Sequence, residues 1–221
     1  MKKIVLIGAG PHAEVVIDIV NSEKVYKIVG IIDSKKEIGS FFNNYKIVGR
    51  QEEIIPICKR LGTKAGIICI GDNWGRKCVS KFILSKIYDF EFVTTIHPKA
   101  IISLNCRIGK GNVIMPGVTV NTKAKIGDFC IINTNSSFEH YCTMENYSSI
   151  SAGVTTGGFV NIGSLSSIAL GVTIFDRINI GKNTVVGSGS LVVKNLPDNV
   201  LAYGVPAQII RPRKIGEKFL K

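Results

Sequence analysis

The chain has 221 residues, of which 45% are hydrophobic, and its 28 Lys and Arg against 16 Asp and Glu give a formal net charge of +12. This length accommodates one large domain or two small ones, and the hydrophobic fraction is ordinary for a globular protein. The positive excess suits a partner that carries negative charge, such as nucleic acid, an anionic membrane surface or small phosphorylated molecules. No basic run reaches five residues and no nucleic-acid-binding motif occurs. We therefore favour phosphorylated small molecules and expect no nucleic-acid partner.

The chain begins MKKIVLIGAGPHAEVV, in which charged residues precede an apolar stretch, as they do in a signal peptide. Gly8, Pro11 and His12 interrupt that stretch before a signal-peptide core is complete. Elsewhere no uncharged apolar stretch is long enough to span a membrane. We therefore expect no membrane partner and, by default, a cytoplasmic location.

Alternating strands and helices are predicted for residues 1–97, the first of three expected domains. The expected strands are residues 2–8, 27–33, 65–72 and 90–96, and the expected helices are residues 12–22, 51–61 and 73–86. Pro11 suits the first turn of the first helix, where its missing N–H would have no partner in any case. The alternation predicts a small Rossmann-like α/β domain with a parallel sheet and helices on its faces. Its four expected strands are about half of a dinucleotide-binding fold.

A glycine-rich turn, GAGPHA at residues 8–13, follows the first strand and opens the first helix, so its free N–H groups can hold a phosphate. Asp33 lies 23 residues beyond Gly10, near the spacing at which an acidic residue meets a ribose hydroxyl. A second glycine turn, at residues 71–73, ends another strand at the same edge of the sheet, where ligands bind. The alternative is that the glycines only make tight turns. The residues predicted to bind a mononucleotide, such as the UDP of a nucleotide sugar, are Gly8, Gly10, Pro11, His12, Asp33, Gly71, Asp72, Asn73 and Arg76.

A six-residue period dominates residues 98–194, the second expected domain. From Ile102 to Val192 every sixth residue is large and apolar except Thr156, and the residue two positions earlier is small or β-branched except at Asn112. This period predicts short flat segments separated by corners, three to each coil of a triangular prism, so that residues 18 apart stack. Sixteen repeats make a little over five coils. Residues 195–221 leave the period and form the third expected domain, a cap with a basic tail.

The six cysteines show no CxxC pair and no metal-ligand spacing. Cys106, Cys130 and Cys142 occupy the small inward position of the repeat, where a thiol is a compact apolar group. We expect the cysteines to be structural and expect no bound metal.

One histidine stands inside the repeat. His140 follows Phe138 by two residues and occupies neither inward position, so its ring is predicted to project outward near a corner. Gly158 stacks on it 18 residues further on and leaves room beside the ring for a substrate group. A neutral imidazole titrates in the range that a general base needs. The pattern predicts a base beside a cleft that admits a thioester, whereas His97, before Pro98 at the domain junction, is expected to be structural.

Several motifs resemble those of the hexapeptide-repeat acyltransferases. GAGPHAEVV, CIGDNWGRK, IHPKA, INTNSSFEHYC, ISAGVTTGG and YGVPAQIIR have counterparts in one branch of that family, the bacterial UDP-amino-sugar N-acetyltransferases and the related sialic acid O-acetyltransferases. The likeness covers nearly the whole chain. It implies that the prism is a left-handed parallel β-helix, that the protein is a homotrimer and that acetyl-CoA is the acyl donor.

The resemblance also implies roles for single residues of the prism. His140 matches the catalytic base of the family, Asn133 matches an asparagine beside the acceptor site, and Gly158 matches a glycine whose N–H meets the acyl carbonyl. The basic tail matches a segment that lies near coenzyme A in the family, and the equally good alternative is a basic tail that is only solvated. The residues expected to contact coenzyme A are Ser149, Gly158, Ala169, Gly187 and Arg211.

Two positions depart from the family pattern. Tyr141 stands where an acidic residue usually follows the histidine, and Ser149 stands where a second histidine often lies near the thioester. An acid normally orients the imidazole of such a base. Glu139, which we include among the candidate catalytic residues, and Glu145 are the candidates to replace it. Adjacent strand residues point in opposite directions, and the sequence does not decide what replaces the acid.

The leading hypothesis is an acetyl-CoA-dependent N-acetyltransferase that acts on a nucleotide-linked amino sugar for surface glycan synthesis. Within the same class, the alternative is O-acetylation of a sialic acid or related sugar. From other classes, the chain could be an NAD-linked oxidoreductase or a non-catalytic nucleotide-sugar-binding protein. The short sheet argues against the oxidoreductase, and Tyr141 and Ser149 suggest the binding protein.

Overall fold

The computed structural model describes residues 1–218 and forms two compact units. The first unit contains Met1–Gly71 and Gly75–Pro98, and the second contains Asp72–Trp74 and the chain from Lys99 onward. The end of the expected basic tail, including Lys221, lies outside the described residues. Within residues 1–218, no helix has the length and apolar character needed to cross a membrane.

The first unit is built on a sheet with the strand order β3-β4-β2-β1-β5-β6. The strands are β1 (Lys2–Ile7), β2 (Tyr26–Ile32), β3 (Phe41–Phe42), β4 (Tyr45–Gly49), β5 (Ala65–Ile68) and β6 (Glu91–Phe92). All neighbours pair in parallel except β3 and β4, which are antiparallel. The central strands β1 and β5 are buried over most of their length, as expected for a parallel sheet with both faces covered.

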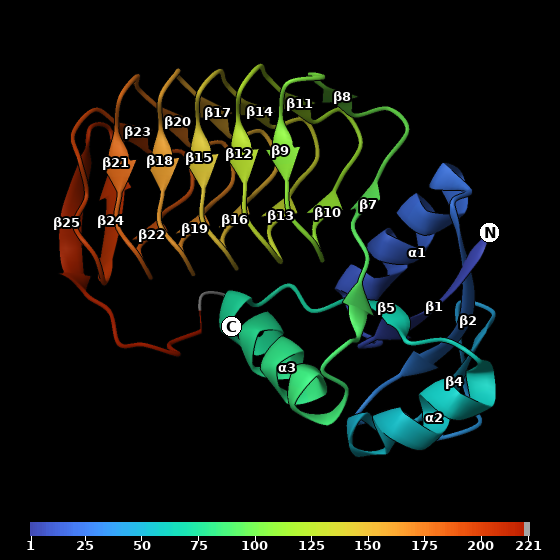
Figure 1. The fold of residues 1–221 in the computed structure, drawn as a ribbon. Helices are drawn as coiled ribbons and strands as arrows, with labels where there is room; N and C mark the ends of the chain where they lie inside the picture. Colours follow the sequence, from blue (N-terminus) through green and yellow to red (C-terminus); the bar gives the residue numbers. More distant parts are fainter. Residues whose placement is uncertain (219–221) are drawn as a thin grey trace. The chain divides into compact units, whose positions relative to one another are not determined.

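Three helices belong to this part of the chain: α1 (Pro11–Glu23), α2 (Ile54–Leu61), which follows a 3₁₀ turn at Gln51–Glu53, and α3 (Asn73–Lys86). Figure 1 shows α1 and α2 on opposite sides of the strands of the first unit. Pro11 occupies the start of α1, as predicted. The α/β character expected from the alternation of strands and helices is therefore confirmed.

The sheet differs from the predicted one in two places. The hairpin β3–β4 is not among the predicted elements, and its turn residues Asn43 and Asn44 have φ values of 44° and 65°. Asparagine tolerates positive φ, and such a pair is typical of a two-residue hairpin turn, so this signal was present in the sequence. Residues 90–96 form two short strands, β6 and β7 (Thr95–Ile96), rather than one.

The second unit is a prism of two-residue strands that fall into three parallel sheets, here called faces I, II and III (Figure 1). Face I contains β10 (Val113–Ile114), β13 (Ile131–Ile132), β16 (Ser149–Ile150), β19 (Ser167–Ile168) and β22 (Val185–Val186). Face II contains β8 (Ile101–Ile102), β11 (Thr119–Val120), β14 (Ser137–Phe138), β17 (Thr155–Thr156), β20 (Thr173–Ile174) and β23 (Leu191–Val192). Face III contains β9 (Arg107–Ile108), β12 (Lys125–Ile126), β15 (Thr143–Met144), β18 (Asn161–Ile162) and β21 (Asn179–Ile180).

The register confirms the predicted stacking. Residues 18 apart are Cα partners, for example Val113 with Ile131 and Ile131 with Ser149. The large residues at the second position of each strand are buried from β10 to β23, and they form the prism core. The six-residue period therefore specifies the parallel β-helix, because each repeat buries one large and one small side chain.

The two exceptions to the period have structural reasons. The hydroxyl of Thr156 accepts the backbone N–H of Glu139 at 3.0 Å, where an apolar side chain would have no acceptor. Asn112 is fully buried, and its carbonyl accepts the N–H of Cys130 at 2.6 Å, while its Nδ2 donates to the carbonyls of Gly109 and Gly127. Both polar side chains satisfy backbone groups inside the prism.

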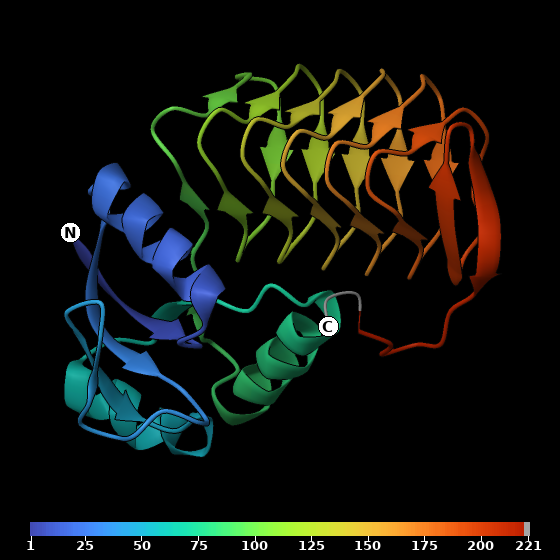
Figure 2. The same ribbon diagram turned by 180° about the vertical axis from the view of Figure 1, so that it is seen from behind.

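The prism ends in an antiparallel hairpin of β24 (Val200–Gly204) and β25 (Ala207–Pro212). Strand β24 pairs in parallel with β22, so the hairpin extends face I (Figures 1 and 2). The six cysteines are all free, and Cys130 and Cys142 are buried in the prism core as predicted.

Candidate active site

The first candidate site is a pocket of about 370 Å³ at the carboxyl ends of β1, β2 and β5. Gly8 follows β1 with a φ of 107°, its N–H donates to the carbonyl of Ile32 at 2.8 Å, and a Cβ there would lie 3.2 Å from the carbonyl oxygen of Cys69. Only glycine fits this close approach between strands. Of the residues predicted to bind the nucleotide, those that line the pocket are Gly8, Gly10, Pro11, His12, Asp33 and Gly71.

Asp33 organises two loops of this pocket. One carboxylate oxygen accepts the N–H of Ala9 at 2.8 Å, and the other accepts the N–H groups of Lys35 and Lys36 at 2.8 and 2.9 Å. Burial by itself would raise the pKa of Asp33, but these hydrogen bonds outweigh it and hold the pKa below its ordinary value. The carboxylate is therefore ionised at neutral pH and fixes the glycine turn in place.

His12 presents a neutral ring to the same pocket. Burial, and then the positive charge of Arg76, lower the pKa of His12 to about 4. Its Nε2 is buried, and none of the residues in the described range hydrogen-bonds to it. A buried polar atom of this kind is suited to a hydrogen bond with a ligand.

Three residues predicted to bind the nucleotide lie elsewhere. Asp72, Asn73 and Arg76 are not among the described residues that line the pocket. The Nδ2 of Asn73 donates to the carbonyl of Ser166 at 3.0 Å and to the hydroxyl of Ser167 at 2.8 Å, so this amide is committed to the prism. Arg76 is 1% exposed and donates to the carbonyls of residues 70 and 71, so it stabilises the turn after β5.

The second candidate site is centred on His140, in the corner between β14 on face II and β15 on face III. The side chain is exposed, as predicted. A Cβ on Gly158, in the next coil, would overlap the Cε1 and Nδ1 atoms of the His140 ring. The position and orientation of the imidazole therefore depend on glycine at residue 158.

Aromatic rings border the histidine. Tyr141 and Phe159 stack with their centroids 4.9 Å apart and their planes 5° apart, and the Phe159 centroid lies 5.4 Å from that of His140. Lys123 lies over the outer side of Tyr141 and Arg177 over that of Phe159, at 5.5 and 4.5 Å from the ring centroids. These four residues are spaced by 18, so counting one coil from Tyr141 would have found Phe159, which the sequence analysis did not single out.

No carboxylate within residues 1–218 hydrogen-bonds to the imidazole of His140. Glu139 instead accepts the side-chain N–H of Asn121 at 2.9 Å, and Glu145 accepts the backbone N–H of Ser164 at 3.1 Å. The expectation that one of these acids orients the ring is not met in this structure. The aromatic neighbours and Gly158 are what position the imidazole here.

The backbone N–H of Gly158 is also occupied. It donates to the carboxylate of Asp176 at 2.6 Å. The same kind of hydrogen bond occurs earlier in the prism, where the N–H of Lys110 donates to the carboxylate of Asp128. Asp176 was not singled out in the sequence, although it stacks on Gly158 with the spacing of 18. The predicted contact of this N–H with an acyl carbonyl would require it to leave Asp176.

Three further predicted residues lie on a different edge of the prism from His140. Asn133 follows β13 and lies in the corner between faces I and II, and Ala169 and Gly187 follow β19 and β22 in the same corner. The Nδ2 of Asn133 donates to the carbonyl of Ile150 at 2.7 Å. One chain therefore presents its candidate residues in two columns, with His140 and Gly158 on one edge and Asn133, Ala169 and Gly187 on another.

Ser149 is not on either edge. It lies within face I, is 9% exposed, and donates its hydroxyl to that of Ser167 at 3.5 Å. Because Ser167 in turn accepts from Asn73, Ser149 belongs to a buried hydrogen-bond chain. Its position does not support the predicted contact with coenzyme A.

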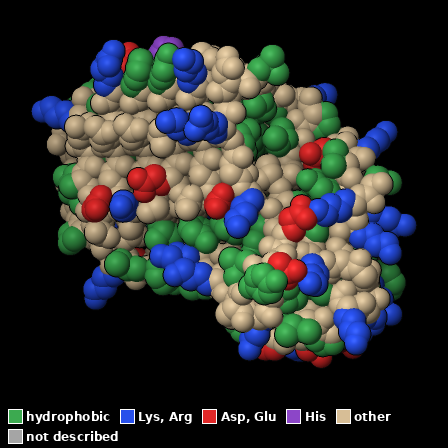
Figure 3. Space-filling model, viewed as in Figure 1, with side chains coloured by type: hydrophobic (Ala, Val, Ile, Leu, Met, Phe, Trp, Pro, Cys, Tyr) green, Lys and Arg blue, Asp and Glu red, His purple; other side chains and the backbone are tan. Residues whose placement is uncertain are grey.

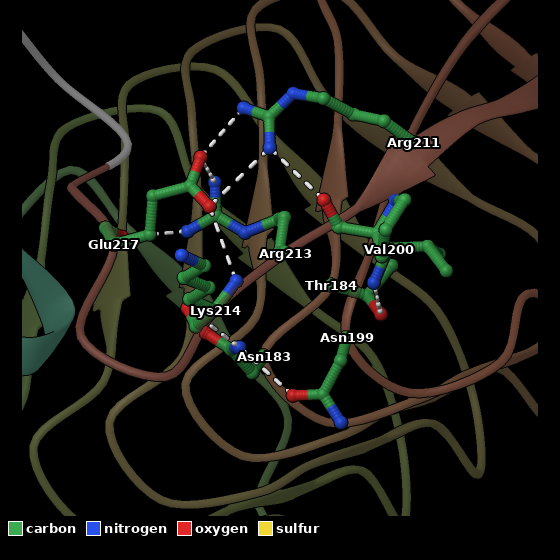
Figure 4. Close-up of polar contacts among 9 residues, drawn as sticks. Asn183, Thr184, Asn199, Val200, Arg211, Arg213, Lys214 and Glu217 are labelled. Carbon is green, nitrogen blue, oxygen red and sulfur yellow. Dashed lines mark hydrogen bonds and ion pairs between the residues drawn. The ribbon is translucent and has the colours of Figure 1, made fainter.

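Arg211 is held by the C-terminal segment itself (Figure 4). Its guanidinium donates to both carboxylate oxygens of Glu217, at 2.5 and 3.3 Å. The hydrogen bond from Arg211, followed by one from the N–H of Lys214, lowers the pKa of Glu217 to about 2. Arg213, whose side chain is 5% exposed, donates to the carbonyl of Glu217 at 2.7 Å and completes the loop. Arg211 remains 48% exposed and accessible to an anion.

Comparisons with known proteins identify similar domains and chains. Residues 3–83 match the family model of the PglD N-terminal domain. The chain is 30% identical over 137 residues to the GDP-perosamine N-acetyltransferase of Escherichia coli O157:H7, a match that covers 62% of this chain and only 53% of that relative, so the chain spans about half the length of this curated relative.

Two solved structures match along nearly the whole chain. A histidine-to-alanine mutant of the GDP-perosamine N-acetyltransferase from Caulobacter crescentus, in complex with CoA and GDP-perosamine, has a TM-score of 0.89 and 31% identity, and the match covers 96% of this chain and 98% of that one. The acetyltransferase domain of PglB from Neisseria gonorrhoeae, in complex with acetyl coenzyme A, has a TM-score of 0.86 and 25% identity, covering 95% and 99%. The chain therefore belongs to the hexapeptide-repeat sugar acetyltransferase family, in which the prism is a left-handed parallel β-helix.

Proposed function

We propose that the protein is an acetyl-CoA-dependent N-acetyltransferase that acylates the amine of a nucleotide-linked amino sugar. The observation that carries the proposal is the exposed His140 ring lying against Gly158 on a prism edge, in a chain of which 96% matches a structure containing CoA and GDP-perosamine. The pocket at Gly8 and Asp33 holds the nucleotide. The reaction serves surface glycan synthesis and takes place in the cytoplasm, where both co-substrates are made.

His140 acts as the general base. Its neutral imidazole takes a proton from the sugar amine as the nitrogen attacks the thioester carbonyl, and the C–S bond then breaks and releases the thiol of coenzyme A. The proton held by the imidazole passes to the departing thiolate, so the residue returns to its starting state. An amine nucleophile needs less help from a general base than a hydroxyl does. Transfer to an amine therefore suits a histidine that has no carboxylate partner among residues 1–218.

The active site is completed by a second copy of the chain in a homotrimer. His140 and Asn133 lie on different edges of one prism, so a single chain cannot bring them to one acyl group. When the edge of one copy that carries His140 faces the edge of the next that carries Asn133, the same contact repeats from copy to copy, and a rotation of one third of a turn between copies closes it into a trimer. Coenzyme A then lies between two prisms, with Ala169 and Gly187 on one side and Gly158 on the other.

Mixing two inactive variants tests this arrangement. We expect His140→Ala and Asn133→Ala each to lose most of their thiol-release activity when pure. After co-expression or joint refolding, about one quarter of the interfaces pair an intact histidine with an intact asparagine, because each has a chance of one half. We therefore expect about a quarter of the wild-type rate, and a mixture as inactive as the pure variants would contradict a shared site.

Release of coenzyme A thiol from acetyl-CoA, measured with a panel of UDP-, GDP- and dTDP-linked amino sugars and with free sialic acids, tests the activity itself. We expect turnover with one or more nucleotide-linked amines and an N-acetylated product by mass spectrometry. Turnover only with a hydroxyl acceptor would establish O-acetylation instead. Binding of a nucleotide sugar without any thiol release would show a non-catalytic binding protein.

A further inference from the structure

Three basic side chains surround a groove on the prism. Arg107, Lys123 and Lys125 line it together with Asn105, and it encloses about 520 Å³. Figure 3 shows basic side chains gathered side by side on the front of the prism, over the position of β9 and β12 in Figure 1. No acidic residue of the described chain lines this groove, which we call the cationic groove.

The β-helix forces two of these charges together. Arg107 and Lys125 are Cα partners in β9 and β12 and point outward, while the residues that follow them, Ile108 and Ile126, belong to the inward positions. Neighbouring strands lie about 4.8 Å apart, and like charges directly opposite one another are destabilising. The ion pairs found within residues 1–218 all involve other cations. The groove therefore concentrates positive charges that form no ion pair with the described side chains.

The third cation connects the groove to the candidate base. Lys123 lies in the corner between faces II and III, with a φ of 59°, and its ammonium is 5.5 Å from the ring centroid of Tyr141. Tyr141 directly follows His140, and their ring centroids are 6.0 Å apart. An anion held in the groove would therefore lie beside the residue that carries out the proposed reaction.

We propose that the cationic groove binds the diphosphate of a co-substrate, an inference that rests on the proposed acetyl transfer. The bridging diphosphate of a nucleotide sugar or of coenzyme A carries two negative charges, one on each phosphate, so it can pair with two of the three cations at once, whereas a single carboxylate can pair with only one. The guanidinium of Arg107 can bind phosphate oxygens in a bidentate manner, and the two lysines supply mobile point charges. Both the nucleotide sugar and coenzyme A contain a diphosphate, so either can be the source.

Inorganic pyrophosphate tests the groove without any need for catalysis. Titration calorimetry would compare the wild-type protein with an Arg107→Gln/Lys125→Gln double variant and with Lys194→Gln, which removes an exposed positive charge of the prism outside the groove. We expect the double variant to bind pyrophosphate at least about tenfold more weakly, because two charge-assisted contacts are lost, and Lys194→Gln to bind as the wild type does. The melting temperature of the double variant should not fall, since a repulsive pair is removed. Equal affinities in all three proteins, or equal losses in both variants, would overturn the proposal.

Steady-state kinetics then identifies the source. The double variant should raise the KM for one co-substrate about fivefold or more, with kcat changed less than about twofold, and the affected co-substrate is the one whose diphosphate occupies the groove. A normal KM for both co-substrates would overturn the proposal. Dissociation of the oligomer in the double variant would overturn it too, because it would show that an acidic segment of a second copy fills the groove. If the protein releases no thiol with any sugar, the proposed function fails, while pyrophosphate binding still decides whether the groove is an anion site. Either single variant serves if the double variant does not fold.

Discussion

Replacing His140 with alanine is expected to lower kcat by about 10²–10⁴-fold, the usual contribution of a general base. The side chain is exposed and has no hydrogen-bond partner among residues 1–218, and its ring contacts are with the partly exposed rings of Tyr141 and Phe159, so its loss should affect stability little. The expected loss corresponds to about 3–5 kcal/mol of transition-state stabilisation. The measurement is thiol release at saturating acetyl-CoA and saturating acceptor.

Two controls separate this effect from others. The melting temperature and the affinity for coenzyme A should match those of the wild-type protein, because the imidazole is assigned to proton transfer rather than to binding. Imidazole added to the assay should restore part of the rate of His140→Ala by supplying the missing base. A variant that keeps most of its kcat would remove His140 from the mechanism, and a large change in KM alone would make it a binding residue.

A single added methyl group at Gly158 is expected to lower kcat about 10²-fold. The Cβ of Gly158→Ala would overlap the ring of His140, and the exposed ring would have to swing toward solvent. A displacement of a catalytic group by about 1 Å can cost this much in rate. The melting temperature should hardly change, because Gly158 is not among the glycines with positive φ.

Thr122→Ala provides the matched control, since Thr122 stacks on the opposite side of His140 in the same column and the change adds no atoms. We expect this variant to keep its kcat within about threefold. If Gly158→Ala is as active as Thr122→Ala, the orientation of the ring against residue 158 has no part in catalysis. If Gly158→Ala also melts at a much lower temperature, the loss reflects packing in the prism.

For the prism, the repeat in the sequence was enough to predict most of the structure. A period of six requires each segment to bury a large and a small side chain, so the register, the stacking at 18 and the outward position of His140 follow together, and the structure has all three. Thr156 broke the pattern without an evident reason in the sequence. Its role, accepting the N–H of Glu139, depends on which backbone groups meet in the coil.

For the first unit, local sequence patterns predicted only some of the residues that line the pocket. The glycine turn and Asp33 were expected at one sheet edge, and the structure brings both to one pocket. Asn73 and Arg76 are polar residues close to the end of a strand, as Asp33 is, but their side chains donate hydrogen bonds to carbonyl groups of the protein itself. The residue type indicates only that a buried polar side chain needs a hydrogen-bond partner. Which partner it finds depends on the packing around it.

The period of six was enough to predict the β-helix and the outward position of the candidate base, because periodic burial is a local requirement that each repeat must meet on its own. The family followed from the resemblance of the sequence motifs. Three features of the site became apparent from the folded structure alone: none of the acids in residues 1–218 hydrogen-bonds to the ring of His140, the N–H of Gly158 is bound to Asp176, and Asn133 lies on a different edge of the prism. Those facts depend on which residues of neighbouring coils and faces come within hydrogen-bond distance. Contacts of this kind depend on how the chain folds in three dimensions, and the spacing of residues along the sequence does not specify them.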